Sequence, residues 1–166
     1  MSRCEPLPNW TATPARRARR VDAYTLVELL VAVALTGVLL SMLVPFLTNL
    51  IREQQQQRAV MELVIIANAI SRYANDNGVL PDDLTVIGVP NLDDPWGQPY
   101  EYLPNTVKGY TGKARKDRFL KPLNTDFDLY SIGPDGESRT PLQNPKSHDD
   151  IIRAANGAYY GVALKF

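Results

Sequence analysis

An apolar segment long enough to cross a membrane constrains this chain more than any other feature. From Leu29 to Val44 every residue is apolar except Thr36, Gly37 and Ser41. The wider segment 24–51 has 28 residues, and as an α-helix it would be about 42 Å long at about 1.5 Å per residue. The hydrocarbon core of a bilayer is about 30 Å thick. The sequence therefore predicts a membrane-spanning helix, in a chain of 166 residues that has room for one modest domain beside it.

The charge is spread unevenly, although the formal net charge is zero. Residues 1–23 carry five Arg and two acidic residues, whereas residues 24–166 carry 13 basic and 16 acidic residues. Basic residues beside a spanning helix favour the cytoplasmic side, so the rest of the chain is expected outside the cytoplasm. The Lys and Arg residues after position 107 alternate with acidic ones. This pattern argues against a nucleic-acid-binding surface.

Four segments follow from the pattern. Residues 1–23 contain Pro and clustered Arg without an apolar period, which is typical of an unstructured leader. Residues 24–51 form the apolar half of a predicted helix, and residues 52–77 form its amphipathic half. One stripe of the second half repeats at helical spacing, through Leu63, Ile66, Ala67, Ile70, Tyr73 and Ala74. Gly78 is placed to end the helix.

Residues 78–166 are expected to form a small β-rich part. Three short runs rich in aromatic and β-branched residues, "YEYLP", "FDLYSIG" and "AYYGVALKF", are bounded by Gly, Pro or Asp. They predict an antiparallel sheet that packs on the stripe of the helix. The predicted fold class is α+β.

Glu28 does not suit a plain membrane anchor, because an acid within a spanning helix costs about 2.5–3.5 kcal/mol at the helix centre and less near its end. A secretory signal peptide has a shorter apolar run than this segment. It also has a small-residue cleavage site after that run, and this segment has none. A single-pass anchor explains the length and the charge bias but leaves Glu28 unexplained. These two interpretations are weighed against a third.

The stretch "YTLVELLVAVALTGVLLSMLVP" resembles the N-terminal helix of type IV prepilins and of type II secretion pseudopilins. The resemblance implies that a prepilin peptidase removes the leader between Ala23 and Tyr24. Tyr24 would then be N-methylated, and Glu28 would be the fifth mature residue. Two positions depart from the family pattern, since Ala23 stands where Gly is usual and Tyr24 where Phe is usual. These departures bear on the efficiency of processing.

Cleavage would also explain the buried charge. It creates an α-amine at Tyr24, and this amine on one subunit can pair with Glu28 of a neighbour that is packed one step along a helical bundle. The expected role of Glu28 is therefore to set the register of assembly. Gly37 and Pro45 lower the stability of the helix. They indicate either a simple kink or, as the resemblance implies, a segment that can unwind inside a filament.

The C-terminal half carries a second resemblance. "DDPWGQPYEYL" and "FDLYSIGPDG", followed by "DDI", are similar to motifs of the G-type major pseudopilin of type II secretion. Trp96 and Tyr100 in the first motif are expected to pack in the core, with Asp94 starting a turn. The segments around 108–126 and 137–148 are longer than in the compact members of that family.

The resemblance also implies a structural calcium ion in the loop that carries Asp135, Asp149 and Asp150. Ca²⁺ takes 6–8 oxygen ligands, including backbone carbonyls. Cys4 is the only cysteine, so no disulfide within the chain can hold this loop, which makes a metal reasonable. The residues alone favour solvated turn aspartates, and only the resemblance favours calcium.

No catalytic motif is present in the sequence. His148 is the only histidine, and no second nitrogen or sulfur ligand accompanies it outside the leader for a zinc or iron site. The resemblance implies a subunit that polymerises into the periplasmic pseudopilus of a type II secretion system and helps to move folded proteins across the outer membrane. Its implied partners are copies of itself, minor pseudopilins, the prepilin peptidase and an inner-membrane assembly platform with its ATPase.

Two other functions remain open from the sequence. One is a surface type IV pilin for adhesion, motility or DNA uptake, although many such pilins close a C-terminal loop with a disulfide. The other is a single-pass envelope protein that binds a ligand and does not polymerise. In the preferred interpretation the chain spans the inner membrane once, with its C-terminal part in the periplasm.

Overall fold

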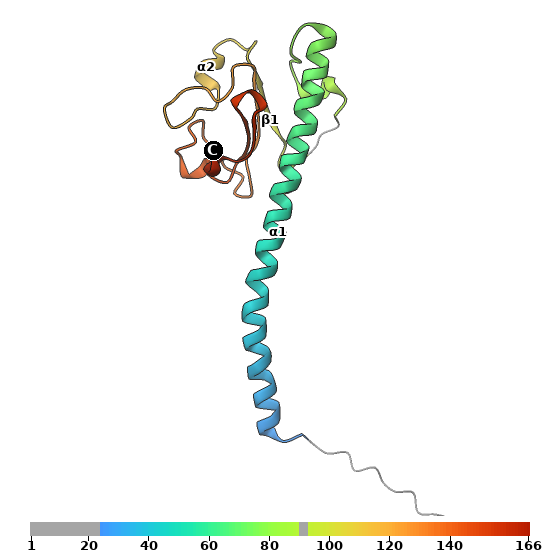
Figure 1. Cartoon of the computed structure of the whole chain (residues 1–166), viewed down its shortest axis with the longest axis vertical. Helices are drawn as coiled ribbons and strands as arrows, with labels where there is room; N and C mark the ends of the chain where they lie inside the picture. Colours follow the sequence, from blue (N-terminus) through green and yellow to red (C-terminus); the bar gives the residue numbers. More distant parts are fainter. Residues whose placement is uncertain (1–23, 90–92) are drawn as a thin grey trace, which may run out of the picture. The chain divides into compact units, whose positions relative to one another are not determined.

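The computed structural model describes residues 24–89 and 93–166 (Figure 1). Its elements are, in order, α1 (Leu26–Asn77), η1 (Leu84–Ile87), β1 (Glu101–Pro104), α2 (Tyr110–Lys113), β2 (Phe127–Ser131), η2 (Pro145–Ser147), β3 (Ile151–Ala154), η3 (Ala155–Gly157), β4 (Tyr159–Val162) and η4 (Ala163–Lys165). The predicted α+β class is confirmed: a long N-terminal helix precedes a four-stranded antiparallel sheet. The chain divides into two compact units between Leu43 and Val44.

Helix α1 ends where the sequence predicts. Asn77 is its last residue, and Gly78 follows with a φ of 74°, in the left-handed region that glycine adopts without a steric cost. The Gly78 amide still donates to the Ala74 carbonyl at 2.8 Å. The helix begins at Leu26, two residues later than expected.

The second half of α1 packs on the sheet through the predicted stripe. Four of its members are buried, namely Leu63, Ile66, Ala67 and Ile70, while Tyr73 and Ala74 are partly buried. The four buried members form one core with Tyr100, Phe127, Leu129 and Ile151. This confirms that the stripe covers the sheet.

The sheet has the order β1-β2-β3-β4, so β1 and β4 are its edges. Strand β3 was not among the three predicted strands. All four of its residues are buried, because the other face of the sheet has a second, smaller core around Leu123, Ile152, Ala154 and Ala163. A strand that is covered on both faces lacks the polar alternation by which half-buried strands are recognised.

The turn between β3 and β4 is the local signal for the missed strand. Ala155, Asn156 and Gly157 all have positive φ values, of 52°, 55° and 90°. Asn-Gly after a short β-branched run is a strong hairpin signal, and the sequence "IIRAANG" carries it.

Candidate functional site

The first half of α1 exposes an apolar surface that no other described residue covers. All of residues 26–51 are exposed, and large apolar side chains make up most of that surface. Within the described residues, α1 is long and apolar enough to cross a membrane, and none of its apolar window is buried inside the protein. Such a surface needs either lipid or other helices around it.

Glu28 is the one charged residue from Leu26 to Ile51, and it lies in the first turn of the helix. Its amide donates to Thr25 Oγ1 at 3.2 Å, as in the capping box that begins many helices. An acid in this turn also interacts favourably with the helix dipole. Thr25 therefore caps the helix at this end, which sequence reasoning missed, although the spacing Thr25-x-x-Glu28 was a signal for it.

The cleavage-site residues differ in what the structure says of them. Tyr24 lies just before the helix and its residue is 78% exposed. Ala23 lies outside the described residues. The proposed new N-terminus is therefore accessible at Tyr24.

Gly37 and Pro45 are both inside α1, and the helix continues through them. A Cβ on Gly37 would meet no described atom within 4 Å, so no close packing among residues 24–89 and 93–166 requires glycine there. Pro45 cannot donate a backbone hydrogen bond, while its own carbonyl accepts one from Thr48 Oγ1 at 2.9 Å. Unwinding at these positions stays a prediction.

The aromatic corner "DPWG" is a packed turn, as predicted. Asp94 Oδ1 accepts from the amides of Trp96 (3.0 Å) and Gln98 (2.8 Å), and its other oxygen accepts from Ser131 Oγ at 2.5 Å. Trp96 packs against the main core, and Tyr100 belongs to it. These contacts give Asp94 and Trp96 a structural role.

Tyr100 links this corner to the helix. Its hydroxyl donates to Glu62 Oε2 at 2.7 Å, and Glu62 also pairs with Arg58 at 2.8 Å. Burial raises the pKa of Tyr100 well above its usual value, and the hydrogen bond to Glu62 is the second cause of this rise. The hydroxyl is therefore a neutral hydrogen-bond donor at any physiological pH.

Two buried arginines organise the polar interior of the C-terminal part. Arg115 Nη2 pairs with Asp150 Oδ2 at 2.5 Å, and both side chains are buried. Arg115 also donates to Ser138 Oγ, and its guanidinium carbon lies 4.3 Å from the centre of the Tyr130 ring. The pair ties the long segment after α2 to the start of β3.

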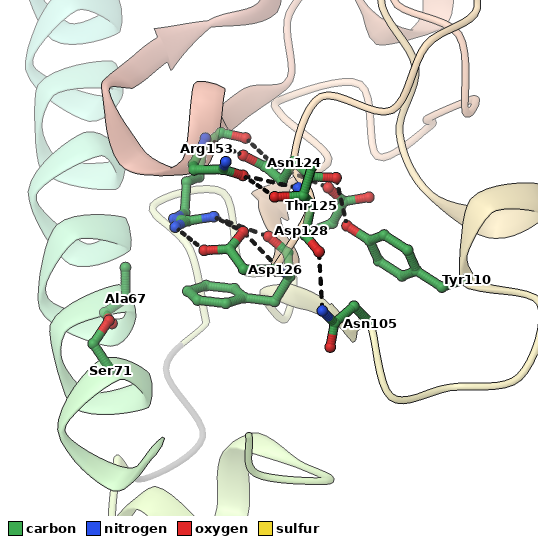
Figure 2. Close-up of polar contacts among 11 residues, drawn as sticks. Ala67, Ser71, Asn105, Tyr110, Asn124, Thr125, Asp126, Asp128 and Arg153 are labelled. Atoms are coloured by element: carbon green, nitrogen blue, oxygen red, sulfur yellow. Dashed lines mark hydrogen bonds and ion pairs between the residues drawn. The ribbon is translucent and has the colours of Figure 1, made fainter. Parts of the chain in front are cut away.

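Arg153 forms the second pair, with Asp126, at 2.6 Å (Figure 2). Burial alone would raise the pKa of Asp126, but hydrogen bonds from Arg153 and from the Phe127 amide outweigh it and hold the pKa below its usual value. The Arg153 guanidinium also covers the Phe127 ring at 3.9 Å. Figure 2 shows Arg153 lying on the side of this network that faces α1.

Asn124 and Asp128 complete the network in Figure 2. Asn124 Nδ2 donates both to Asp128 Oδ1 and to the Arg153 carbonyl, each at 2.9 Å. Asp128 also accepts from the Arg115 amide at 2.6 Å. Burial raises the pKa of Asp128 above its usual value, although these hydrogen bonds and the nearby arginines oppose the rise.

The three acids predicted to hold calcium are not one cluster. Asp135 and Asp149 are neighbours, because the Asp135 amide donates to Asp149 Oδ2 at 3.3 Å. Asp150 instead pairs with Arg115 and accepts from Ser138 Oγ at 2.7 Å. Over residues 24–89 and 93–166 no group of three His, Cys, Asp or Glu side chains could hold a metal ion.

The three acids together therefore do not fit one calcium ion. The charge of Asp150 is neutralised by a guanidinium, which would itself repel Ca²⁺. Asp135 and Asp149 would need several backbone carbonyls or waters to reach the usual six to eight oxygens. Calcium in this loop stays a prediction, with its side-chain ligands reduced to these two.

Sequence reasoning did not identify Arg115 or Arg153 as interior residues. Arg115 lies in a run of mixed charge, "ARKDR", which is typical of a solvated surface, and Arg153 lies in the run "IIRAA". Their acidic partners are 35 and 27 positions away in the sequence. Only the run "IIRAA", with an arginine between apolar residues, was a weak signal.

Comparisons with known proteins address both halves of the chain. Residues 18–44 match the family model described as a prokaryotic N-terminal methylation motif. Type II secretion system core protein G of Pectobacterium carotovorum is 31% identical over 80% of this chain and 83% of its own. The protein of the same name from Escherichia coli K12 is 30% identical, over 75% of this chain and 90% of its own. The protein of the same name from Aeromonas hydrophila is 29% identical, over 74% of this chain and 89% of its own. No solved structure matches the chain.

Proposed function

Because this chain belongs to the type II secretion system core protein G family, the pseudopilins, we propose that it polymerises through its N-terminal helix into a periplasmic pseudopilus that helps folded proteins cross the outer membrane. The observation that carries the proposal is the apolar surface of residues 26–51, which is exposed all round and interrupted by a single charge. A helix of this kind is stable in lipid as a monomer and in a helical bundle as a polymer. One surface thus serves both states of the subunit.

Processing by a prepilin peptidase is the first step of the proposal. The matched methylation motif spans both Ala23 and Tyr24, and Tyr24 is exposed just before the helix. The peptidase would cut between them on the cytoplasmic side, and Tyr24 would then be methylated on its new α-amine. Methylation retains the positive charge of this amine, which the next step requires.

Glu28 is the proposed acceptor of that charge. An unpaired Glu28 carboxylate in hydrocarbon costs free energy. Pairing with the Tyr24 amine of an adjacent subunit offsets this cost only when the two helices are in one axial register. The exposed apolar side chains around it would bring the helices together, and the charge pair would select the register. This division of work supports a filament with one defined helical rise.

The location and partners follow from the same family membership. The subunit would span the inner membrane once before assembly, with residues 52–166 in the periplasm. It would meet the inner-membrane assembly platform, whose ATPase supplies the energy, and the minor pseudopilins. We propose a structural role and no enzymatic activity; the two buried arginines, Arg115 and Arg153, are engaged in ion pairs with Asp150 and Asp126.

The experiment that tests processing is mass spectrometry of the intact protein and its N-terminal peptide from native membranes. A chain that begins at singly methylated Tyr24 supports the proposal. A chain that still carries Cys4 and the Arg cluster contradicts it, because a retained leader would block the charge pair.

Assembly is tested with Glu28→Ala and a matched control, Thr25→Ala. The control removes the cap hydrogen bond at the same helix end but keeps the carboxylate. We expect Glu28→Ala to remain in the membrane and to lose pseudopili, at least tenfold by immunoblot of sheared filaments, and Thr25→Ala to assemble. Normal assembly of Glu28→Ala would contradict the register role.

A further inference from the structure

The turn at residues 116–121 holds two large apolar side chains out into solvent. Phe119 is 75% exposed and Leu120 is 62% exposed. We call this turn the apolar tip. Large apolar residues that are fixed at a surface are candidates for an interface.

The tip is rigid, because Asp117 holds its backbone. Asp117 Oδ1 accepts from the amides of Phe119 (2.7 Å) and Lys121 (2.9 Å), and the Asp117 amide donates to the Lys121 carbonyl at 2.8 Å. Leu120 has a φ of 61°, which is unfavourable for a residue with a branched side chain. The backbone at Leu120 is therefore locally strained, and in this conformation the side chains of Phe119 and Leu120 face solvent.

The tip is also cationic. Lys116, Arg118 and Lys121 surround its apolar residues, while the one acid, Asp117, is used inside the turn. Neither Arg118 nor Lys121 makes an ion pair with any residue that the structure describes. A partner should therefore combine an apolar recess with acidic residues at its rim.

The C-terminal unit has a groove that combines apolar side chains with a larger polar, acidic part. A groove of about 600 Å³ lies among α1, η1 and β1. Apolar side chains line part of it, including those of Ile66, Leu84 and Val89, and carboxylates also line it, including those of Asp82, Asp93 and Glu101. The last three residues are exposed. We call this the acidic groove.

The tip cannot reach the groove within one chain. The groove includes β1, which is one edge of the sheet. The tip lines a hollow with Leu164 and Phe166, which follow β4 at the opposite edge. Two different surfaces at opposite edges of one sheet form a heterologous contact between copies, and contacts of this kind generate open helical assemblies when the rotation does not close.

We propose that the apolar tip of one copy docks into the acidic groove of the next copy in the filament, with Phe119 and Leu120 as anchors and with charge pairs around them. The proposal rests on the polymerisation proposed above. It adds a second contact, outside the helical bundle, which depends on salt because its charges lie at the rim.

Cysteine cross-linking tests the contact in assembled pseudopili. The mature chain has no cysteine, because Cys4 lies in the leader. The variant Arg118→Cys/Thr85→Cys places one thiol at the tip and one at the groove and keeps both anchors. We expect a ladder of dimers, trimers and longer species after oxidation.

Two controls make the ladder specific. Each single-cysteine variant can form at most dimers. The pair Thr111→Cys/Thr85→Cys moves the first thiol from the tip to the exposed surface of α2, and we expect no ladder from it. A ladder of equal intensity from this pair would overturn the proposal.

Charge exchange gives an independent measurement. We expect Arg118→Glu to reduce the yield of pseudopili several-fold, and the added change Asp82→Arg to restore it. Fluorescence of Trp96, the one tryptophan after the leader, verifies that both variants are folded. No loss with Arg118→Glu, or a loss that Asp82→Arg does not repair, overturns the contact.

The two proposals fail in different ways. Pseudopili that form normally but give no ladder from the Arg118→Cys/Thr85→Cys pair overturn the docking contact and leave the proposed function intact. If the parent chain forms no pseudopili in cells that carry the complete secretion system, the proposed function itself fails.

Discussion

At the scale of single residues, Arg115 shows how a charge becomes part of the interior. Its guanidinium reaches Asp150 and Ser138 and covers the Tyr130 ring, while its amide is held by Asp128. Arg suits this position because its planar fork donates in several directions at once and also stacks on aromatic rings. A Lys side chain offers one charged nitrogen and could not make all of these contacts.

Removing one member of this pair should be costly. We expect Arg115→Met to lower the free energy of unfolding by about 3–5 kcal/mol, because it leaves the Asp150 carboxylate buried without its partner. The double variant Arg115→Met/Asp150→Leu should lose less than the single one. Urea unfolding followed by Trp96 fluorescence measures both, and additive losses would contradict a coupled pair.

Asp126 should contribute to the loss of stability in acid. Its folded pKa is below the usual value of 3.8, so its contribution is present above about pH 4 and is lost as the pH falls through the folded pKa. We expect Asp126→Asn to be less stable at pH 7 and to lose less stability than the parent between about pH 5 and pH 2. Melting temperatures at a series of pH values test this, and parallel curves for the two proteins would contradict it.

At the scale of elements, α1 is one helix in two environments. Its second half buries a narrow stripe against the sheet, whereas its first half is exposed throughout as far as the described residues show. The same backbone pattern is thus stabilised by the core in one half and would be stabilised by lipid or neighbouring helices in the other. Helical stability in proteins comes mostly from such packing and less from intrinsic propensity.

Two adjacent isoleucines provide a matched test of the stripe. Ile66 is 1% exposed and Ile65 is 58% exposed. We expect Ile66→Ala to lower the free energy of unfolding by about 2–5 kcal/mol, through lost burial and a cavity, and Ile65→Ala to change it by no more than about 0.5 kcal/mol. Equal effects in urea unfolding would mean that the helix does not pack on the sheet as described.

The sheet shows the limit of pattern recognition within an element. Strand β3 joins β2 to β4, yet its four residues include Arg153 and Ala154 and show no alternation. Its pairing partners, together with the second core on its outer face, determine that it is a strand. The hairpin signal at Asn156-Gly157 was the one local feature that marked it.

At the scale of the whole molecule, contacts within the protein hold the long connection between β2 and β3, residues 132–150. Within the protein, Ser138 Oγ donates to Asp150 across this connection, and Lys146 pairs with Glu137. Arg115, from the segment after α2, contacts both Ser138 and Asp150. Calcium at Asp135 and Asp149 would add a further constraint. The two sources of stability respond differently to a chelator.

The calcium prediction is tested by melting curves of the mature protein in calcium and in chelator. If the ion binds, it should stabilise the folded state by about 2.7 kcal/mol at 100 times its Kd, and Asp135→Ala should remove that increment without changing the melt in chelator. Identical curves for the parent in both buffers would show that protein contacts alone close this loop.

The sequence by itself determined the features that depend on neighbours in the chain. The membrane-length helix, its end at Gly78, the apolar stripe and the single charge at Glu28 are all read from residues within a few turns of one another. Hydrophobic periodicity and helix termination are local properties, so these predictions agree with the structure. The "DPWG" corner could also be predicted from neighbouring residues, because Asp94 accepts hydrogen bonds from the amides of Trp96 and Gln98 in the turn that follows it.

The tertiary structure alone decided where the charges of the C-terminal part lie. The resemblance to pseudopilins implied that Asp150 binds a metal, whereas folding brings Arg115, 35 positions away, to its carboxylate. Strand β3 and the two buried arginines depend likewise on partners that are distant in the sequence. A buried charge or a doubly covered strand is stable only through such partners, and the distance in sequence leaves no local pattern from which to predict them.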